Sequence, residues 1–531
     1  MGMLLQLCAL VALPTAAPLL QPTARRAPQL IRLRAVGNEA LSAKSWEAVG
    51  ASAEMVGAAV ACGAGDGPTK IQAMCYAAVA NNKDCLIADQ TGSGKTLAYL
   101  LPVVEKLRKE ERRETEPRNN ADGACAPRAV VLAPTAELAA QVFGVARAVS
   151  ASGAAVRARC ATSEGFDARD AARALKRGGG ACDILIATPG RLAKLLDMGA
   201  VSLARAGDVV LDEVDVLALA DDGAALKPIL SADGVGAEAR FVFVTATLPK
   251  RVEKQLRDEF EGLETFKGPG LHRAPLGLSV ALVDCSAPRE PARAGSSSGR
   301  RRPADDDLLD LDAIFEEDVA EGKPARKPSR DKKGRNRPKA APTRQEAAAT
   351  KKVDAVFERK KAALLESLTL GRAPVDGSAA TAGLGAAARS LVFCNTIESC
   401  RRVENALKRA DRRGRDRSLL AYHSALPADA RRKNLGTFAA ASSRKPAVLV
   451  CTDRASRGVD FDEPVDLVVL FDWPRDPNEF LRRVGRTARC GRKGHATILA
   501  AGAYLPLARE VKAACDDGRP VDSAGGDSDV F

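Results

Sequence analysis

The sequence predicts an α/β fold with two tandem domains, each a mostly parallel sheet flanked by helices. Short apolar runs without polar alternation recur along the chain, as is typical of parallel strands covered on both faces. Stretches with helical periodicity separate these runs, and such alternation is typical of doubly wound sheets. At 531 residues the chain is long enough for two or three domains.

The polar residues that follow the strands are the first place to look for a site. The expected strands are, in chain order, 84–88, 129–133, 183–187, 208–212, 240–244, 390–394, 447–451, 466–471 and 495–500. A clear helical pattern at 96–113 follows the first of them. Open α/β sheets bind their ligands beyond the carboxyl ends of the strands. The loops directly after these strands therefore hold the candidate residues.

Composition narrows the class of protein and of partner. A hydrophobic content of 46% with 28% charged residues fits a soluble globular protein. The net charge of +13 suggests a polyanionic partner, either nucleic acid or a membrane surface. Aromatic residues make up only 4%, which favours contacts with phosphates over base stacking. The 13 cysteines form no C-x-x-C pair and there are three histidines, so we expect reduced thiols and no Cys/His zinc site.

The first 37 residues have the composition of a targeting segment. Residues 1–18 contain an apolar run of signal-peptide length, which is too short to span a bilayer as a mature helix. Residues 19–36 carry arginines and no acid. This pattern resembles the bipartite presequences of algae with complex plastids, so we expect a plastid (chloroplast) protein that leaves the membrane after processing. A mitochondrial presequence, secretion and an untargeted tail are the alternatives.

Two stretches interrupt the strand and helix pattern. Residues 286–352 are rich in Pro, Ala, Ser and charge, which predicts a disordered insertion. An acidic run at 305–321 precedes a basic run at 323–339, which we expect to add salt-sensitive, nonspecific RNA affinity. An Ala/Gly-rich stretch at 373–388 predicts a second surface insertion.

A phosphate-binding loop follows the first strand. The sequence DQTGSGKT at 89–96 lies between a strand and a helix, where glycines turn backbone N–H groups toward a phosphate. Lys95 would reach the β and γ phosphates of a nucleotide, and the Thr96 hydroxyl would hold Mg²⁺. Asp89 is an unexpected acid so close to a phosphate. The expected nucleotide-binding residues of this loop are Thr91, Gly92, Ser93, Gly94, Lys95 and Thr96.

Three acids follow the strand at 208–212, in the sequence LDEVDVL. Asp212 is expected to bind Mg²⁺ directly or through water, and Glu213 to polarise the attacking water. A polar loop with three solvated acids is the alternative. Because a phosphate-binding loop is also present, the sequence favours a nucleoside triphosphatase site over this alternative.

With these motifs in place, the sequence resembles the DEAD-box RNA helicases over roughly residues 40–505, apart from the two insertions. GPTKIQ (67–72) resembles the family's adenine-reading motif, and TAT (245–247) the motif that couples the acids to the second domain. The resemblance implies ATP and Mg²⁺ as cofactors and two RecA-like domains, 38–268 and 269–515. Residues 516–531 would form an acidic tail.

The resemblance also implies roles for single residues. For the adenine it implies Trp46, Thr69 and Gln72, and for the ATP ribose Asp460. Arg486 and Arg489, in LRRVGRTAR (481–489), would act as arginine fingers beside the catalytic Lys95 and Glu213. The implied RNA-binding residues are Pro134, Thr135, Thr188, Gly190, Arg191, Thr452 and Arg457. The implied interdomain coupling residues are Asp215, Thr245, Thr247 and Arg482.

The sequence departs from the family pattern at several of these motifs. Ala136 stands where the family has Arg, Val214 replaces Ala, and Thr245 replaces Ser. Arg482 stands where the family has His, and we expect it to form a charged contact with Asp215 when the cleft between the domains closes. A solvated surface position is the alternative for Arg482.

Together these features predict an ATP-dependent RNA helicase that binds RNA without sequence preference and separates short duplexes, acting as a monomer in organellar RNA metabolism. The principal alternative is a non-catalytic RNA clamp, in which ATP closes the cleft without turnover. A DNA translocase of the wider superfamily is a third interpretation, which GPTKIQ disfavours.

Overall fold

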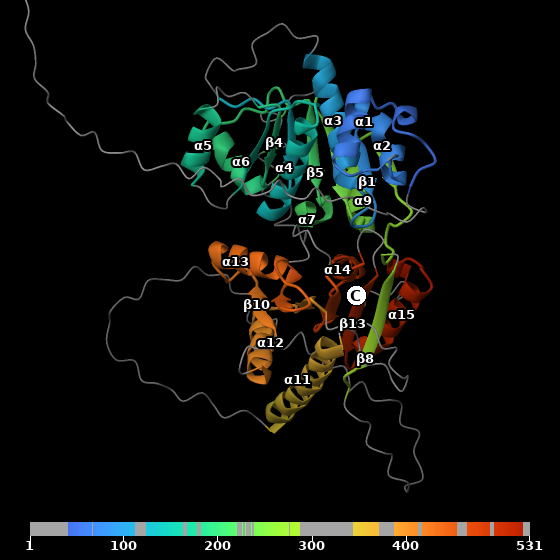
Figure 1. The fold of residues 1–531 in the computed structure, drawn as a ribbon, viewed down its shortest axis with the longest axis vertical. Helices are drawn as coiled ribbons and strands as arrows, with labels where there is room; N and C mark the ends of the chain where they lie inside the picture. The colour runs from blue at the N-terminus through green and yellow to red at the C-terminus, as the bar shows by residue number, and fades with distance from the viewer. Residues whose placement is uncertain are drawn as a thin grey trace, which may run out of the picture.

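The computed structural model describes residues 41–65, 67–111, 124–162, 167–177, 182–219, 238–275, 277–286, 344–370, 387–411, 417–453, 465–488 and 493–523, and positions 226, 229 and 235. These residues form two domains, one above the other in Figure 1. The first is coloured blue to green, and the second runs from the yellow-green strand β8 to red. Residues 268–277, the interdomain segment, connect the last strand of the first domain to the first strand of the second.

The first domain is built on a seven-stranded parallel sheet with the strand order β3-β4-β2-β5-β6-β1-β7. Its strands are β1 (Cys85–Ala88), β2 (Ala129–Leu132), β3 (Ala158–Ala161), β4 (Ile184–Ala187), β5 (Asp208–Asp212), β6 (Arg240–Thr245) and β7 (Glu264–Lys267). Its helices are η1 (Glu47–Val49), α1 (Ala53–Ala61), α2 (Lys70–Ala80), α3 (Lys95–Glu111), α4 (Ala136–Ala151), α5 (Ala168–Arg177), α6 (Pro189–Asp197), α7 (Val214–Leu219) and α9 (Lys250–Glu259).

The second domain repeats this plan with a six-stranded parallel sheet, in the order β10-β11-β9-β12-β13-β8. Its strands are β8 (Leu278–Asp284), β9 (Arg389–Phe393), β10 (Ser418–Tyr422), β11 (Ala447–Cys451), β12 (Leu467–Leu470) and β13 (Gly494–Ala500). Its helices are α11 (Arg344–Leu370), α12 (Ile397–Ala410), α13 (Ala428–Ala439), α14 (Pro477–Val484), α15 (Tyr504–Asp516) and η5 (Val521–Ser523).

Both faces of each sheet are covered, which explains the continuous apolar runs. Along β2, Val130 enters one buried apolar cluster and Val131 enters the cluster on the opposite face. The cysteines among the described residues form no disulfide, and most are buried as small apolar side chains. In the part of the chain that the structure describes, no helix is long and apolar enough to cross a bilayer.

All the predicted strands are present, and four further strands escaped prediction: β3, β7, β8 and β10. β3 (ARCA) and β7 (ETFK) lie at the two edges of the first sheet, and β8 and β10 at the edges of the second. Edge strands are only half buried, and β3 and β7 accordingly mix polar and apolar residues and lack the continuous apolar run. β8 and β10 do contain short apolar runs, at 280–283 and 419–422, which the sequence analysis did not assign to strands.

Two predicted boundaries are wrong. Helix α11 begins at Arg344, so the last residues of the predicted disordered stretch 286–352 are helical. The second domain extends past 515, because η5 packs back on it: Val521 is fully buried and its N–H donates to the His272 carbonyl at 2.8 Å. Most of both insertions, the basic run 323–339 and the segment 1–37 lie outside the described residues.

Candidate active site

The phosphate loop forms the turn between β1 and α3. Gly92 and Gly94 have φ angles of 81° and 88°, which favour glycine. A Cβ at Gly94 would also lie 2.5 Å from Gln72 Nε2, so both the backbone conformation and the close approach of Gln72 require glycine at this position. The Lys95 ammonium donates to the carbonyl oxygens of Asp89 and Gln90 at 2.6 and 2.7 Å. The lysine thus lies over the loop, where phosphates of a nucleotide would bind.

The segment GPTKIQ supports this loop from the side. Thr69 caps α2, and its hydroxyl donates to the Ser93 carbonyl at 2.9 Å. Gln72 is 0% exposed, and its amide donates to the Gly94 carbonyl at 3.0 Å while accepting from Thr69 N–H at 2.8 Å. Thr69 and Gln72 therefore position the phosphate loop.

The prediction for Trp46 as a residue packed near the base is not supported. Its indole is 1% exposed and packs edge-on against Tyr76, with ring centroids 6.3 Å apart. A ring this deeply buried offers no open face to a ligand. Trp46 is a core residue of the first domain.

The acids lie at the carboxyl end of β5, as predicted. Asp212 accepts from the Tyr99 hydroxyl and from Glu213 N–H, both at 3.0 Å. Burial raises the pKa of Asp212, and the nearby charge of Lys95 opposes the shift. Burial, followed by the charge of Asp215, raises the pKa of Glu213 to about 7. Glu213 has a φ of 53°, a left-handed conformation rarely adopted by glutamate, as is common where a site constrains the backbone.

Thr96 and Asp212 carry oxygen donors of the kind that Mg²⁺ prefers, and they would hold the ion together with the phosphates of a nucleotide. Mg²⁺ in nucleotide sites takes one or two protein oxygens, with phosphates and water completing the octahedron. Among the described residues no group of three His, Cys, Asp or Glu could hold a metal by itself. A site that is completed by nucleotide phosphates needs no such group.

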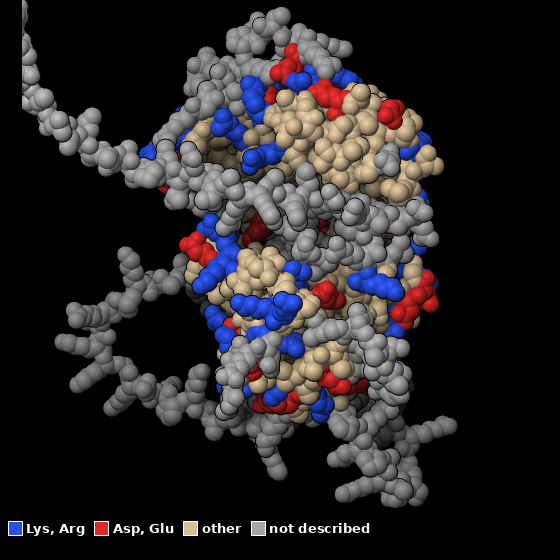
Figure 2. All heavy atoms as spheres, in the orientation of Figure 1, with Lys and Arg blue, Asp and Glu red and all other residues tan. Residues whose placement is uncertain are grey.

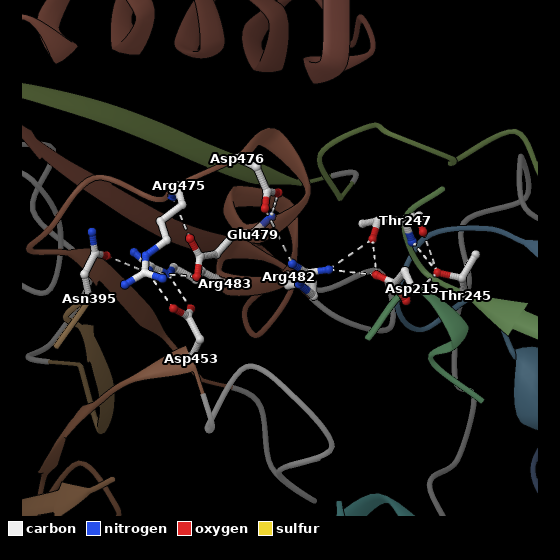
Figure 3. A network of polar contacts seen from close by, with 10 residues as sticks. All are labelled: Asp215, Thr245, Thr247, Asn395, Asp453, Arg475, Asp476, Glu479, Arg482 and Arg483. Atoms are coloured by element: carbon white, nitrogen blue, oxygen red, sulfur yellow. Dashed lines mark hydrogen bonds and ion pairs between the residues drawn. The ribbon is translucent and has the colours of Figure 1, made fainter. Parts of the chain in front are cut away.

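A polar network crosses from the first domain to the second (Figure 3). Asp215, 2% exposed, accepts from the Thr245 hydroxyl at 2.8 Å and from the Thr247 hydroxyl at 2.6 Å. From α14 of the second domain, Arg482 donates to the same carboxylate at 2.8 Å and to the Thr247 hydroxyl at 3.2 Å. Arg482 is 8% exposed, so the solvated alternative is wrong and the predicted Asp215–Arg482 contact is confirmed.

The neighbouring Arg483 anchors α14 within the second domain (Figure 3). Its buried guanidinium donates to Asp453 at 2.7 and 2.8 Å, to Asn395 at 2.8 Å and to the Asp472 carbonyl at 3.0 Å. Every side of the charge is paired, as a buried arginine requires. Arg483 thereby fixes the direction in which Arg482 leaves the helix.

Arg486 lies one helical turn beyond Arg482, and it is also buried. Burial lowers its pKa to about 10, and attraction by Glu213 of the other domain opposes the shift. The predicted arginine finger and the predicted water-polarising acid therefore lie close enough for their charges to interact. Asp460, Arg457 and Arg489 lie outside the described residues.

Comparison with known proteins identifies the family to which these two domains belong. Residues 69–255 match the DEAD/DEAH box helicase family, and residues 383–491 match the helicase conserved C-terminal domain. The chain is 37% identical over 460 residues to DEAD-box ATP-dependent RNA helicase 50 of Arabidopsis thaliana. The chain belongs to the DEAD-box family. The match covers 86% of this chain and 48% of the relative, and the protein of that name from Oryza sativa subsp. japonica matches at 37%, covering 90% and 62%. The chain thus spans half to three fifths of the length of these curated relatives.

Solved structures of DEAD-box proteins share the tandem RecA-like fold. S. cerevisiae Dbp5 bound to RNA and ADP BeF3 aligns with a TM-score of 0.57 at 19% identity, covering 86% of this chain and 89% of that one. The DEAD-box helicase Mss116 bound to ssRNA and UDP-BeF aligns with a TM-score of 0.58 at 19% identity, covering 91% and 80%. The predicted fold class is confirmed.

The residues of the first domain for which the family resemblance implies RNA contact lie at two helix N-termini. Thr135 follows Pro134 and caps α4 by accepting from Leu138 N–H at 3.2 Å, and Thr188 is the N-cap of α6. These helices follow β2 and β4, which are neighbours in the sheet. Helix N-termini carry partial positive charge and unpaired N–H groups that suit phosphates.

Gly190 is exposed at this edge, and Thr452 is half-buried at the end of β11 in the second domain. Arg191 differs from the expectation, because its side chain is buried and offers no open phosphate contact. Figure 2 shows Lys and Arg side chains spread over both domains on the visible face, with acids between them.

Two interdomain contacts escaped the sequence analysis. The Tyr422 hydroxyl, at the end of β10, donates to Glu137 in the first turn of α4 at 2.6 Å. The Thr91 hydroxyl of the phosphate loop lies 3.5 Å from the Gly485 carbonyl at the end of α14. Glu137 belongs to the motif PTAELA, but no sequence signal pairs it with a tyrosine 285 positions away.

Proposed function

We propose that this protein is an RNA-dependent ATPase that binds RNA without sequence preference and separates short RNA duplexes, with ATP and Mg²⁺ as cofactors. The observation that carries the proposal is the composite site. Lys95 lies near Asp212 and Glu213 in one domain, and Arg486 of the other domain lies close enough to Glu213 for their charges to interact. Asp215 and Arg482 join the two domains. Such a site is complete only when the cleft is closed.

The residues divide the chemistry between the domains. Lys95 binds the β and γ phosphates, while Thr96 and Asp212 hold the magnesium ion. The bound ion would neutralise charge on the phosphates. Glu213 orients the attacking water and accepts its proton, for which a pKa near 7 is suitable. Arg486 stabilises the charge that develops on the transferred phosphoryl group, because arginine pairs with phosphate oxygens and stays protonated.

Closure also explains how RNA binding is linked to hydrolysis. The helix N-termini at Thr135 and Thr188 lie on the first domain and Thr452 on the second, so a bound strand would contact both when the cleft closes. Contacts of this kind reach phosphates and 2′-hydroxyls and not base edges, which gives preference for RNA without preference for sequence. The composite site lies within one chain, and we propose a monomer.

The first test of the proposal is strand separation. A short RNA duplex with a single-stranded extension is expected to separate when ATP and Mg²⁺ are added to the full chain. Lys95→Ala should abolish the activity, because the phosphates lose their charged partner. Separation of an all-DNA duplex at the same rate would contradict the RNA preference. ATP-dependent retention of RNA without separation or turnover would support the clamp alternative instead.

We further propose a plastid location, supported by the acid-free, arginine-containing composition of residues 19–36 after an apolar run. Fusion of residues 1–37 to a fluorescent protein in an alga with a complex plastid is expected to direct it there. Mitochondrial fluorescence would contradict the proposal.

A further inference from the structure

Asp89 is an acid at the start of the phosphate loop, where DEAD-box proteins usually have a small residue. An exposed carboxylate there would repel a nucleotide, but the Asp89 side chain is only 4% exposed. It lies close enough to Lys95 for the two opposite charges to attract. Its Oδ1 accepts from Gln90 N–H at 2.8 Å and from Gly270 N–H at 3.1 Å. Gly270 belongs to the interdomain segment, so this side chain fastens the phosphate loop to the connection between the domains.

Two glycines allow the interdomain segment to lie close against the phosphate loop. Gly268 N–H donates to the Ala88 carbonyl at 2.8 Å. A Cβ at Gly268 would overlap the Asp89 carboxylate, and a Cβ at Gly270 would overlap the Gln90 side chain. Neither glycine is among those with positive φ, so close approach, and not backbone conformation, is what requires glycine in the sequence GPG.

Two residues after Gly270, the interdomain segment contacts the second domain. The His272 carbonyl accepts from Val521 N–H at 2.8 Å, and His272 Nδ1 lies 3.7 Å from Asp522 of η5. The segment then leads into β8, which pairs along its whole length with β13. Between Gly270 and His272 the chain therefore passes from contacts with the phosphate loop to contacts with the second domain.

Asp89 and Gln90, which contact the interdomain segment, also contact Lys95 at the other end of the phosphate loop. The Lys95 ammonium donates to the carbonyl oxygens of Asp89 and Gln90, while the Asp89 side chain and the Gln90 N–H hold the other side of this turn. Phosphates that bind Lys95 would compete with these carbonyls for its hydrogens. A shift of the loop at Asp89 would then reach Gly270 directly.

We propose that Asp89 is a positioning residue that couples nucleotide binding in the phosphate loop to the interdomain segment, and thereby to closure of the cleft on RNA. The inference rests on the proposed function, since it assumes that ATP and RNA bind to the same closed state. Asp89 contacts neither the nucleotide nor the RNA in this account. Its effect should appear in the linkage between the two ligands.

The test measures that linkage in the full chain without hydrolysis. The affinity for a single-stranded RNA oligonucleotide is determined with and without a non-hydrolysable ATP analogue and Mg²⁺, and the ratio is the coupling factor. Asp89→Ala is expected to lower the coupling factor about tenfold, within the usual range of coupling energies, and to change RNA affinity without nucleotide less than about twofold. Asp89→Asn keeps an acceptor oxygen for Gly270 N–H and should retain most of the coupling.

Glycine variants give an independent comparison. Gly268→Ala should displace the Asp89 carboxylate and lower the coupling as Asp89→Ala does. Gly57→Ala in α1, where a Cβ meets no atom within 4 Å, is the matched control and should keep it. Coupling at the wild-type level in Asp89→Ala, or equal loss in Asp89→Asn, would overturn the inference. Absence of coupling in the wild type would instead count against the proposed function.

Discussion

Glu213→Gln is expected to lower RNA-stimulated ATP turnover at least about 100-fold, the scale at which general-base groups contribute. The amide has the size of the carboxylate but cannot accept a proton from water. Asp212 and Lys95, which we propose hold the metal and the phosphates, keep their contacts in this variant. ATP-dependent RNA binding should therefore persist, and phosphate release and RNA retention measured on the same sample separate the two steps.

Glu261→Gln is the control for this prediction, since Glu261 is an exposed glutamate of the same domain. Its turnover should equal that of the wild type. A Glu213→Gln variant that hydrolyses ATP within about threefold of the wild type would show that another group activates the water. Loss of RNA binding together with turnover would instead show that Glu213 contributes to closure.

The second large effect is expected at Arg482. Arg482→Ala would leave the Asp215 carboxylate buried in the closed state with its two threonine donors but without a charged partner. Removing one member of a buried interface pair costs about 2–5 kcal/mol, which corresponds to at least about a 30-fold loss in the closure equilibrium. RNA-stimulated turnover should fall by that factor, while ATP hydrolysis without RNA changes less. Arg482→His restores a hydrogen-bond donor, but the imidazole is shorter than the arginine side chain. Its RNA-stimulated turnover should therefore lie between that of Arg482→Ala and that of the wild type.

A double-mutant cycle isolates the contact. Asp215→Ala, Arg482→Ala and the double variant are compared, and the double variant should lose little more than either single variant. Arg257→Ala, which breaks an exposed pair with Glu253, should stay within about twofold of the wild type. Additive losses at Asp215 and Arg482 would contradict an energetic link between them.

Motifs that combine a buried strand with a short polar loop could be predicted from the sequence. β1 followed by DQTGSGKT and β5 followed by DEVD have this form, and the structure brings Lys95, Asp212 and Glu213 together as the spacing implied. The Asp215–Arg482 contact could be predicted as well, because the two positions belong to motifs of a known family.

Contacts between elements that lie far apart in the chain could not be predicted. Tyr422 and Glu137 meet only because the end of β10 in one domain lies against the first turn of α4 in the other, and no local pattern marks them. Asp89 looked anomalous because its partner, Gly270, enters from the other side of the loop. The failure at Trp46 has a related cause, since a motif position indicates a residue's neighbourhood and not the depth at which it is buried.

The most direct test of the account is the rate of phosphate release from ATP by the full chain, with and without single-stranded RNA at saturating concentration. The composite site predicts slow release alone and a rise of at least about tenfold with RNA, because RNA-driven closure brings Arg486 to the phosphates that Lys95 binds. Rapid release that RNA does not change would contradict the coupling between the cleft and the active site.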